Sequence, residues 1–144
     1  MRVLILNTDY EAFLEDLYAE NPGLAHQSYD QQMAVRNRSL FGAADFYSEG
    51  LKANGVEAAD VHLNNRPMQL RWAAEHGVTI RAEEPVESQG LGAKMRRLFG
   101  AKSEPLSQLA AMPDWVRSVM VAQTEHFRPD VILNQVMQDR KSVV

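Results

Sequence analysis

The first 76 residues alternate between apolar runs and helical patterns in the order strand, helix, strand, helix. An uninterrupted apolar run, Val3–Leu6, opens the chain, and the stretch from Phe41 to His76 contains a helix end, a strand and a second helix. Continuous apolar strands separated by helices are typical of parallel sheets that are covered on both faces. The sequence therefore predicts an α/β fold with a Rossmann-like, doubly wound parallel sheet.

Caps and breakers set the expected boundaries of these elements. We expect strands at 2–7, 57–63 and 131–134, and helices at 10–19, 28–54, 67–76 and, kinked near Pro113, 105–127. The long helix is expected to start at a capping box, Ser28 with Gln31, and to stop at Gly55. Its later half repeats Leu40, Ala44, Tyr47 and Leu51 at helical spacing, which predicts a stripe that packs on the sheet. Val78–Ile80 could add a fourth strand.

Composition excludes several classes of function. A chain of 144 residues can form one domain with a real core. Its net charge of −4 gives no general attraction to nucleic acid. The chain has no cysteine, hence no disulfide framework, and its first apolar run is too short for a signal peptide or a membrane span. A cytoplasmic location is therefore expected.

The last six residues do not continue the pattern that precedes them. A helix normally follows a buried parallel strand, yet 139–144 reads DRKSVV, which one reading frame of a common sequencing adapter also encodes. We therefore expect a natural domain at 1–138, a non-native tail at 139–144, and a longer parent protein. A genuine short charged tail is the alternative.

Small polar side chains follow the predicted strands, where open α/β sheets bind their ligands. They are Asn7, Thr8, Asp9 and Tyr10 after the first strand, Asn64 after the second, and Asn134 and Gln135 at the third. Amides both donate and accept hydrogen bonds, so this set suits the recognition of hydroxyl groups. Asp9 is the candidate general base. The alternative is structural: Thr8 or Asp9 caps the following helix, and Asn64 and Asn65 shape a turn and cap the next helix.

The remaining motifs say less about function. The four histidines do not have the spacing of metal ligands. His26 could face the ligand cleft expected at the strand ends, whereas His62 should be packed inside its strand. No glycine-rich dinucleotide fingerprint follows the first strand. We expect residues 80–104 to form a variable loop or insertion. Its basic residues Lys94, Arg96 and Arg97 could touch an anionic membrane surface weakly, but a solvated loop is the favoured explanation. The tryptophans, Trp72 and Trp115, should be core or interface residues and not platforms on which a sugar stacks.

Four segments together resemble a family of bacterial glycosyltransferases. These are MRVLILNTDYEAFLEDLY, SYDQQM, FGAADFYSEGLKANGVEAADVHLNNRPMQLRWAAEHG and HFRPDVILNQVMQD. They are similar to the amino-terminal region of two-domain (GT-B) enzymes, including spore-maturation-type members, that act in polysaccharide and surface-glycan synthesis. The resemblance covers most of 1–138 except the segment 80–104, and includes no catalytic fingerprint.

The resemblance implies that this chain is one half of a GT-B enzyme. In that family the amino-terminal domain shapes the acceptor side of a cleft, and the carboxy-terminal domain binds the nucleotide sugar. The expected partners are then a glycan or lipid-linked acceptor and the missing carboxy-terminal domain. No cofactor is expected in this half, and it should not transfer sugar alone. The alternative is a stand-alone Rossmann-like module for nucleotide binding, signalling or protein interaction.

Overall fold

The computed structural model describes residues 1–80 and 112–135, which form an α/β unit around a three-stranded parallel sheet. The strands are β1 (Arg2–Asn7), β2 (Glu57–His62) and β3 (Val131–Gln135), in the order β2-β1-β3. The helices are α1 (Glu11–Glu20), η1 (Leu24–His26), α2 (Tyr29–Arg38), α3 (Phe46–Ala53), α4 (Arg66–Glu75) and α7 (Asp114–Phe127). The predicted α/β class and parallel sheet are confirmed.

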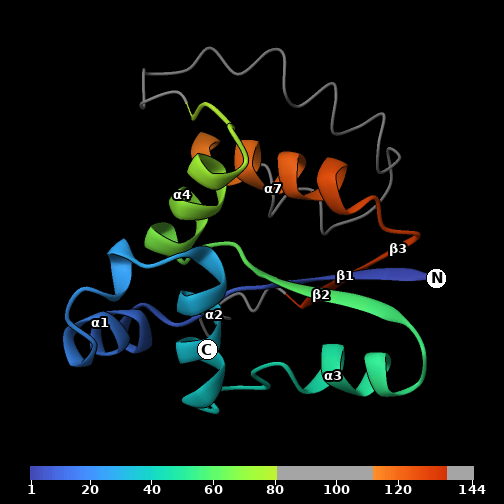
Figure 1. Cartoon of the computed structure of the whole chain (residues 1–144), viewed down its shortest axis with the longest axis horizontal. Coiled ribbons are helices and arrows are strands. Elements are labelled where there is room, and N and C mark those ends of the chain that lie inside the picture. The colour runs from blue at the N-terminus through green and yellow to red at the C-terminus, as the bar shows by residue number, and fades with distance from the viewer. Residues whose placement is uncertain (81–111, 136–144) are drawn as a thin grey trace, which may run out of the picture.

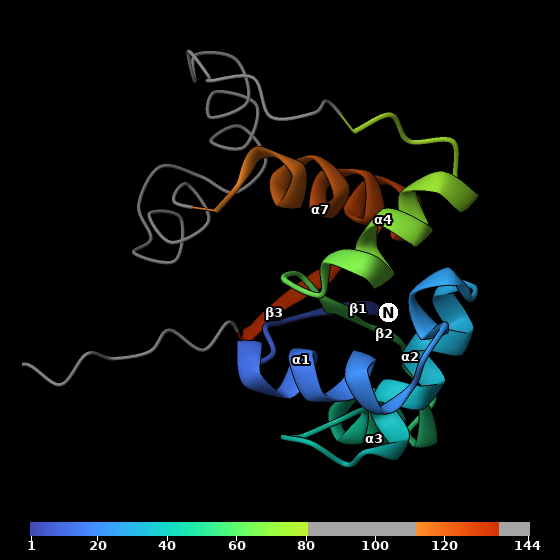
Figure 2. The same cartoon turned by 90° about the vertical axis from the view of Figure 1, so that its left-hand side faces the viewer.

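Helices lie on both sides of the sheet (Figures 1 and 2). α4 and α7 lie on one side, and α1, α2 and α3 lie on the other. All three strands run in one direction, so their carboxyl ends meet at one edge. That edge lies away from the chain's N-terminus, on the side of α1 and α2 in Figure 1. This is where the polar residues that follow the strands gather.

The larger part of the core lies between the sheet and α7. Leu4 and Leu6 of β1 pack with Val61 of β2 and with Val116 and Met120 of α7. On the opposite face a smaller cluster brings Val3, Ile5 and Ala58 against Leu51 of α3. Burial at about 25 cal/mol per Å² of apolar surface makes these contacts the main stabilising term. The two tryptophans join such clusters, as predicted: Trp72 is buried, and Trp115 packs against the larger cluster.

Several predicted boundaries hold to within a residue. The capping box at Ser28 and Gln31 is formed, and Gly55 ends α3 in the left-handed conformation with φ of 77°. Asn65 caps α4 by accepting a hydrogen bond from the N–H of Met68, at 3.3 Å. These signals are local in sequence, which explains why they could be read in advance.

The predicted long helix at 28–54 is wrong, because it is two helices with a turn at 39–45. The backbone turns left-handed at Leu40, Gly42 and Ala44, with φ of 57°, 60° and 45°. The predicted apolar stripe on this helix is therefore not formed. Leu40 is 77% exposed and Tyr47 is also exposed, whereas Leu51 packs on the sheet. The stacking of Phe41 on the ring of Phe13 in α1, at 4.0 Å between centroids, holds the turn to another element.

The expected fourth strand is also not formed in the described chain. Val78 and Ile80 instead pack against the cluster around Trp72 and Val119. The first part of the 105–127 helix, the basic residues Lys94, Arg96 and Arg97, and the tail at 139–144 lie outside the described residues.

Candidate functional site

A cavity of about 420 Å³ opens at the carboxyl ends of the strands. The sheet register places Asn7 beside His62 of β2 on one side and Gln135 of β3 on the other, and all three side chains line the cavity. Thr8 and Asp9, which follow β1, complete this wall. The strand ends thus bring together polar residues that are far apart in the sequence, as the parallel topology predicts.

A buried charged cluster lies in this wall. Arg36 of α2 donates from Nη2 to Asp9 Oδ1 at 2.5 Å and from Nε to Oδ2 at 3.4 Å. His62 Nδ1 lies 3.2 Å from the same Oδ2. The three side chains are almost fully buried, with 1–4% of their surface exposed. Both carboxylate oxygens of Asp9 are therefore engaged, one by Arg36 and the other by Arg36 and His62.

Asn64 fixes the backbone of Asp9 from the end of β2. The N–H of Asp9 donates to Asn64 Oδ1 at 2.8 Å, and Asn64 Nδ2 donates to the carbonyl of Asp9 at 2.6 Å. The side chain of Asn7 is turned along the sheet, where it donates to Asp60 Oδ1 at 3.1 Å. Asn64 thus acts as a positioning residue, with its side-chain amide committed to Asp9.

The site makes a pH-dependent contribution to stability. Burial alone raises the pKa of the Asp9 carboxyl, but hydrogen bonding to His62 and Arg36 and the positive charge of Arg36 outweigh it and hold that pKa below its ordinary value of 3.8. A carboxyl with a lower pKa in the folded than in the unfolded state stabilises the fold above its unfolded pKa. We expect this contribution to be complete above about pH 5 and to be lost progressively as the pH falls further.

Urea denaturation of the wild type and Asp9→Asn between pH 3 and pH 7 measures this effect. The difference in unfolding free energy should shrink toward acid pH, because asparagine does not ionise. Glu20→Gln, at an exposed carboxylate at the end of α1, should keep the acid dependence of the wild type. A difference that stays constant over this range would contradict the assignment.

The opposite wall of the cavity is the turn between α2 and α3. Phe41 and residues 42–44 of the turn line the cavity, together with Tyr47 of α3. Tyr10, about half exposed at the N-cap of α1, contacts Phe41 edge to face, at 5.9 Å between centroids. Non-glycine residues with positive φ cost free energy and cluster at functional sites. An aromatic, strained turn facing a buried charged cluster is therefore the second distinguishing feature of this edge.

The structure brings together only part of the predicted set. Of the candidates, those that line the cavity are Asn7, Thr8, Asp9 and Gln135. Tyr10 lies beside its aromatic wall, and Asn64 holds Asp9. His26, exposed in η1, and Asn134, which pairs with Leu6 in the register, are not among the lining residues. Asp9 does not cap α1, whose N-cap residue is Tyr10.

Two central residues of the site, Arg36 and His62, were not predicted as functional. His62 was expected to be packed inside its strand, and it is 1% exposed, but its ring also meets Asp9. A readable signal existed in β2, where Asp60 and His62 alternate with Ala59 and Val61. Polar residues at alternate positions of a strand share one face of the sheet. Arg36 has no comparable local signal.

Comparison with known proteins does not assign the chain to a family. No protein-family model matches the chain, and neither a curated protein nor a solved structure shows significant similarity to it. Within 1–80 and 112–135, no helix is long and apolar enough to cross a membrane. In the same residues no group of three or more potential ligands could hold a metal ion. The function is therefore argued from the strand-end site itself.

Proposed function

We propose that the chain is the acceptor-side domain of a glycosyltransferase of GT-B type. Such an enzyme transfers a sugar from a nucleotide-sugar donor to a hydroxyl of a glycan or lipid-linked acceptor. The supporting architecture is a parallel sheet with a polar cavity at the carboxyl ends of its strands. The resemblance of the sequence to spore-maturation-type glycosyltransferases points the same way.

One observation carries the proposal, namely the pairing of His62 with Asp9. His62 Nδ1 lies 3.2 Å from Asp9 Oδ2, within ion-pair distance, and neither nitrogen of the buried ring has a well-formed hydrogen bond among the described residues. A carboxylate at Nδ1 favours the tautomer that carries its proton there, which leaves a lone pair on Nε2. A general base for an acceptor hydroxyl needs such a lone pair at the edge of a cavity.

Asp9 and His62 then share the role that the sequence assigned to Asp9 alone. Asp9 is engaged by Arg36, and its lowered pKa makes it a poor proton acceptor at neutral pH. In the proposal His62 Nε2 takes the proton of the acceptor hydroxyl, and Asp9 orients the ring and stabilises the imidazolium that forms. Asn7 and Gln135 hold neighbouring hydroxyls through their amides.

The donor belongs to another domain in this proposal. A carboxy-terminal domain would supply the nucleotide-sugar site, so the 144-residue chain should bind acceptor sugars weakly and transfer nothing. Turnover by the purified chain would contradict this division. Cytoplasmic location is part of the same proposal, because nucleotide sugars are cytoplasmic donors.

NMR titration of the ¹⁵N-labelled chain tests the proposal. The probes are methyl glycosides of glucose, galactose, mannose and N-acetylglucosamine, and uridine and guanosine diphosphates as the competing class. We expect one of the glycosides to shift signals at Asn7, His62 and Gln135, with His62→Gln about tenfold weaker through one lost hydrogen bond. His26→Gln, outside the cavity, is the matched control and should bind like the wild type.

The same titration separates the alternative function. Binding of a nucleoside diphosphate at the cavity, with no response to any glycoside, would favour a stand-alone nucleotide-binding module. Imidazole ¹⁵N shifts add an independent check, because they report which nitrogen of His62 carries the proton at neutral pH. A proton on Nε2 would remove the proposed base.

A further inference from the structure

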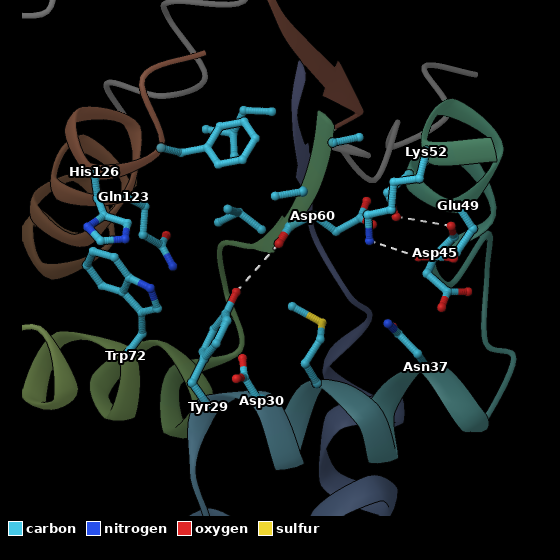
Figure 3. A pocket seen from close by; sticks show the side chains of 17 residues that line it. Tyr29, Asp30, Asn37, Asp45, Glu49, Lys52, Asp60, Trp72, Gln123 and His126 are labelled. Atoms are coloured by element: carbon cyan, nitrogen blue, oxygen red, sulfur yellow. Dashed lines mark hydrogen bonds and ion pairs between the residues drawn. The ribbon is translucent and has the colours of Figure 1, made fainter. Parts of the chain in front are cut away.

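A second cavity, of about 290 Å³, lies along the free edge of β2 (Figure 3). The floor is the strand itself, at 58–61, and the walls come from α2, α3, α4 and α7. Among the strands of residues 1–80 and 112–135, in the order β2-β1-β3, the strand β2 has a neighbour on one side only. The cavity occupies the other side, so it is a groove that runs beside an unpaired strand edge.

The backbone of β2 offers hydrogen-bonding groups to this groove. The N–H groups of Glu57 and Leu63 donate to carbonyls of Met1 and Asn7, toward β1. In a parallel ladder, residues one position along point their N–H and C=O groups the opposite way. Ala58 and Asp60 therefore face outward. On this side of Asp60 the Tyr29 hydroxyl lies 3.5 Å from the carbonyl oxygen, to which it donates a hydrogen bond.

Gln123 of α7 is the second observation that points to a ligand. It lines the groove and is 4% exposed, yet neither its amide nitrogen nor its amide oxygen has a hydrogen-bond partner in the described part of the chain. In Figure 3 the side chain extends from α7 into the space that separates it from Tyr29 and Asp60. Buried amides are almost always paired, and one that donates and accepts matches a peptide group.

The charge of the groove restricts what can fill it. Four carboxylates line it, those of Asp30, Asp45, Glu49 and Asp60, against one cation, Lys52. Lys52 is already paired with Glu49 at 2.8 Å. Burial and the negative charges of Asp30 and Asp60 raise the pKa of the Tyr29 hydroxyl, consistent with an anionic groove. An occupant with positive charge is favoured.

We propose that this groove binds an extended, basic peptide segment of a partner protein. The segment adds to the sheet beside β2, with its backbone bonded to Ala58 and Asp60 and to the amide of Gln123. Lysine or arginine side chains of the segment lie near Asp30 and Asp45. Addition of a strand to a sheet edge is a common mode of peptide recognition, in which backbone bonds give affinity and side chains give specificity.

The test uses two synthetic peptides, acetyl-VKVKV-amide and its glutamate counterpart acetyl-VEVEV-amide, added to the ¹⁵N-labelled chain. We expect the lysine peptide to shift the amide signals of Ala58 and Asp60 and to slow their hydrogen exchange. The glutamate peptide should bind at least tenfold more weakly. Equal binding of both peptides, or no response up to a few millimolar, overturns the proposal.

Two variants distinguish an effect on peptide binding from an effect on the stability of the fold. Gln123→Leu should weaken the lysine peptide about tenfold while leaving the melting temperature equal or higher, because it removes an unpaired buried amide. Leu133→Ser changes β3, at the opposite end of the described sheet, and should bind the peptide like the wild type. Peptide-induced shifts at Val131–Gln135 in place of β2, or loss of binding only through unfolding, would contradict the assignment.

Discussion

Arg36→Met is expected to lower the free energy of unfolding by about 3–5 kcal/mol at pH 7, the range for breaking a buried ion pair by removing one partner. Methionine keeps much of the apolar stem but leaves the Asp9 carboxylate buried beside His62 alone. Arg36 also approaches the ring of Phe13, 5.7 Å from its centroid, so the change loosens the aromatic wall as well. Urea denaturation followed by circular dichroism measures the loss.

Arg38→Met is the matched control for this prediction. Arg38 lies in the last turn of the same helix and is exposed, so the same change should cost less than about 0.5 kcal/mol. An Arg36→Met variant that is no less stable than Arg38→Met would show that the buried cluster does not hold α2 to the end of β1.

Leu4→Ala should strongly destabilise the fold, with a loss of about 2–5 kcal/mol. Leu4 is 1% exposed and packs in the larger cluster between the sheet and α7. Removal of three side-chain carbons there leaves a cavity that a parallel sheet paired on both sides cannot close easily. Thermal or urea unfolding of the two proteins gives the difference.

Leu133→Ala makes the same chemical change in β3, where the side chain is 39% exposed. We expect a loss below about 1 kcal/mol, because little apolar surface returns to water. Equal effects at Leu4 and Leu133 would contradict the assignment of the core to the α7 side of the sheet.

Local signals in the sequence were sufficient for much of the fold. The run Val3–Leu6 predicts the central strand because only a strand covered on both faces is apolar without interruption. Ser28 with Gln31, and Asn65 before Pro67, predict helix starts because each cap satisfies backbone N–H groups within four residues. Such signals depend on neighbours in the chain, so tertiary structure does not override them.

The failures have a different physical origin. In the turn at 39–45 Phe41 stacks on Phe13, a contact between elements that no local pattern contains. Helical spacing of apolar residues continues through this turn, and the positive φ values of Leu40 and Ala44 are not encoded by residue type. Propensity is a weak prior where a tertiary contact fixes the backbone.

The candidate site, like the fold, could be predicted from the sequence only in part. The rule that ligands meet strand ends was enough to select Asn7, Asp9 and Gln135 as lining residues. Arg36 reaches Asp9 from a helix 27 positions further along the chain, so its partner could not be inferred without the fold.

The sheet order also bears on synthesis of the protein. β1 is made first, yet both of its neighbours come later: Arg2 meets Glu57 after 55 positions and Asp130 after 128. During translation its apolar residues must wait for nearly the whole described chain before the second neighbour arrives. Non-local pairing of this kind slows folding and leaves apolar segments open to association. The described sheet can therefore be completed only after β3 has been synthesised.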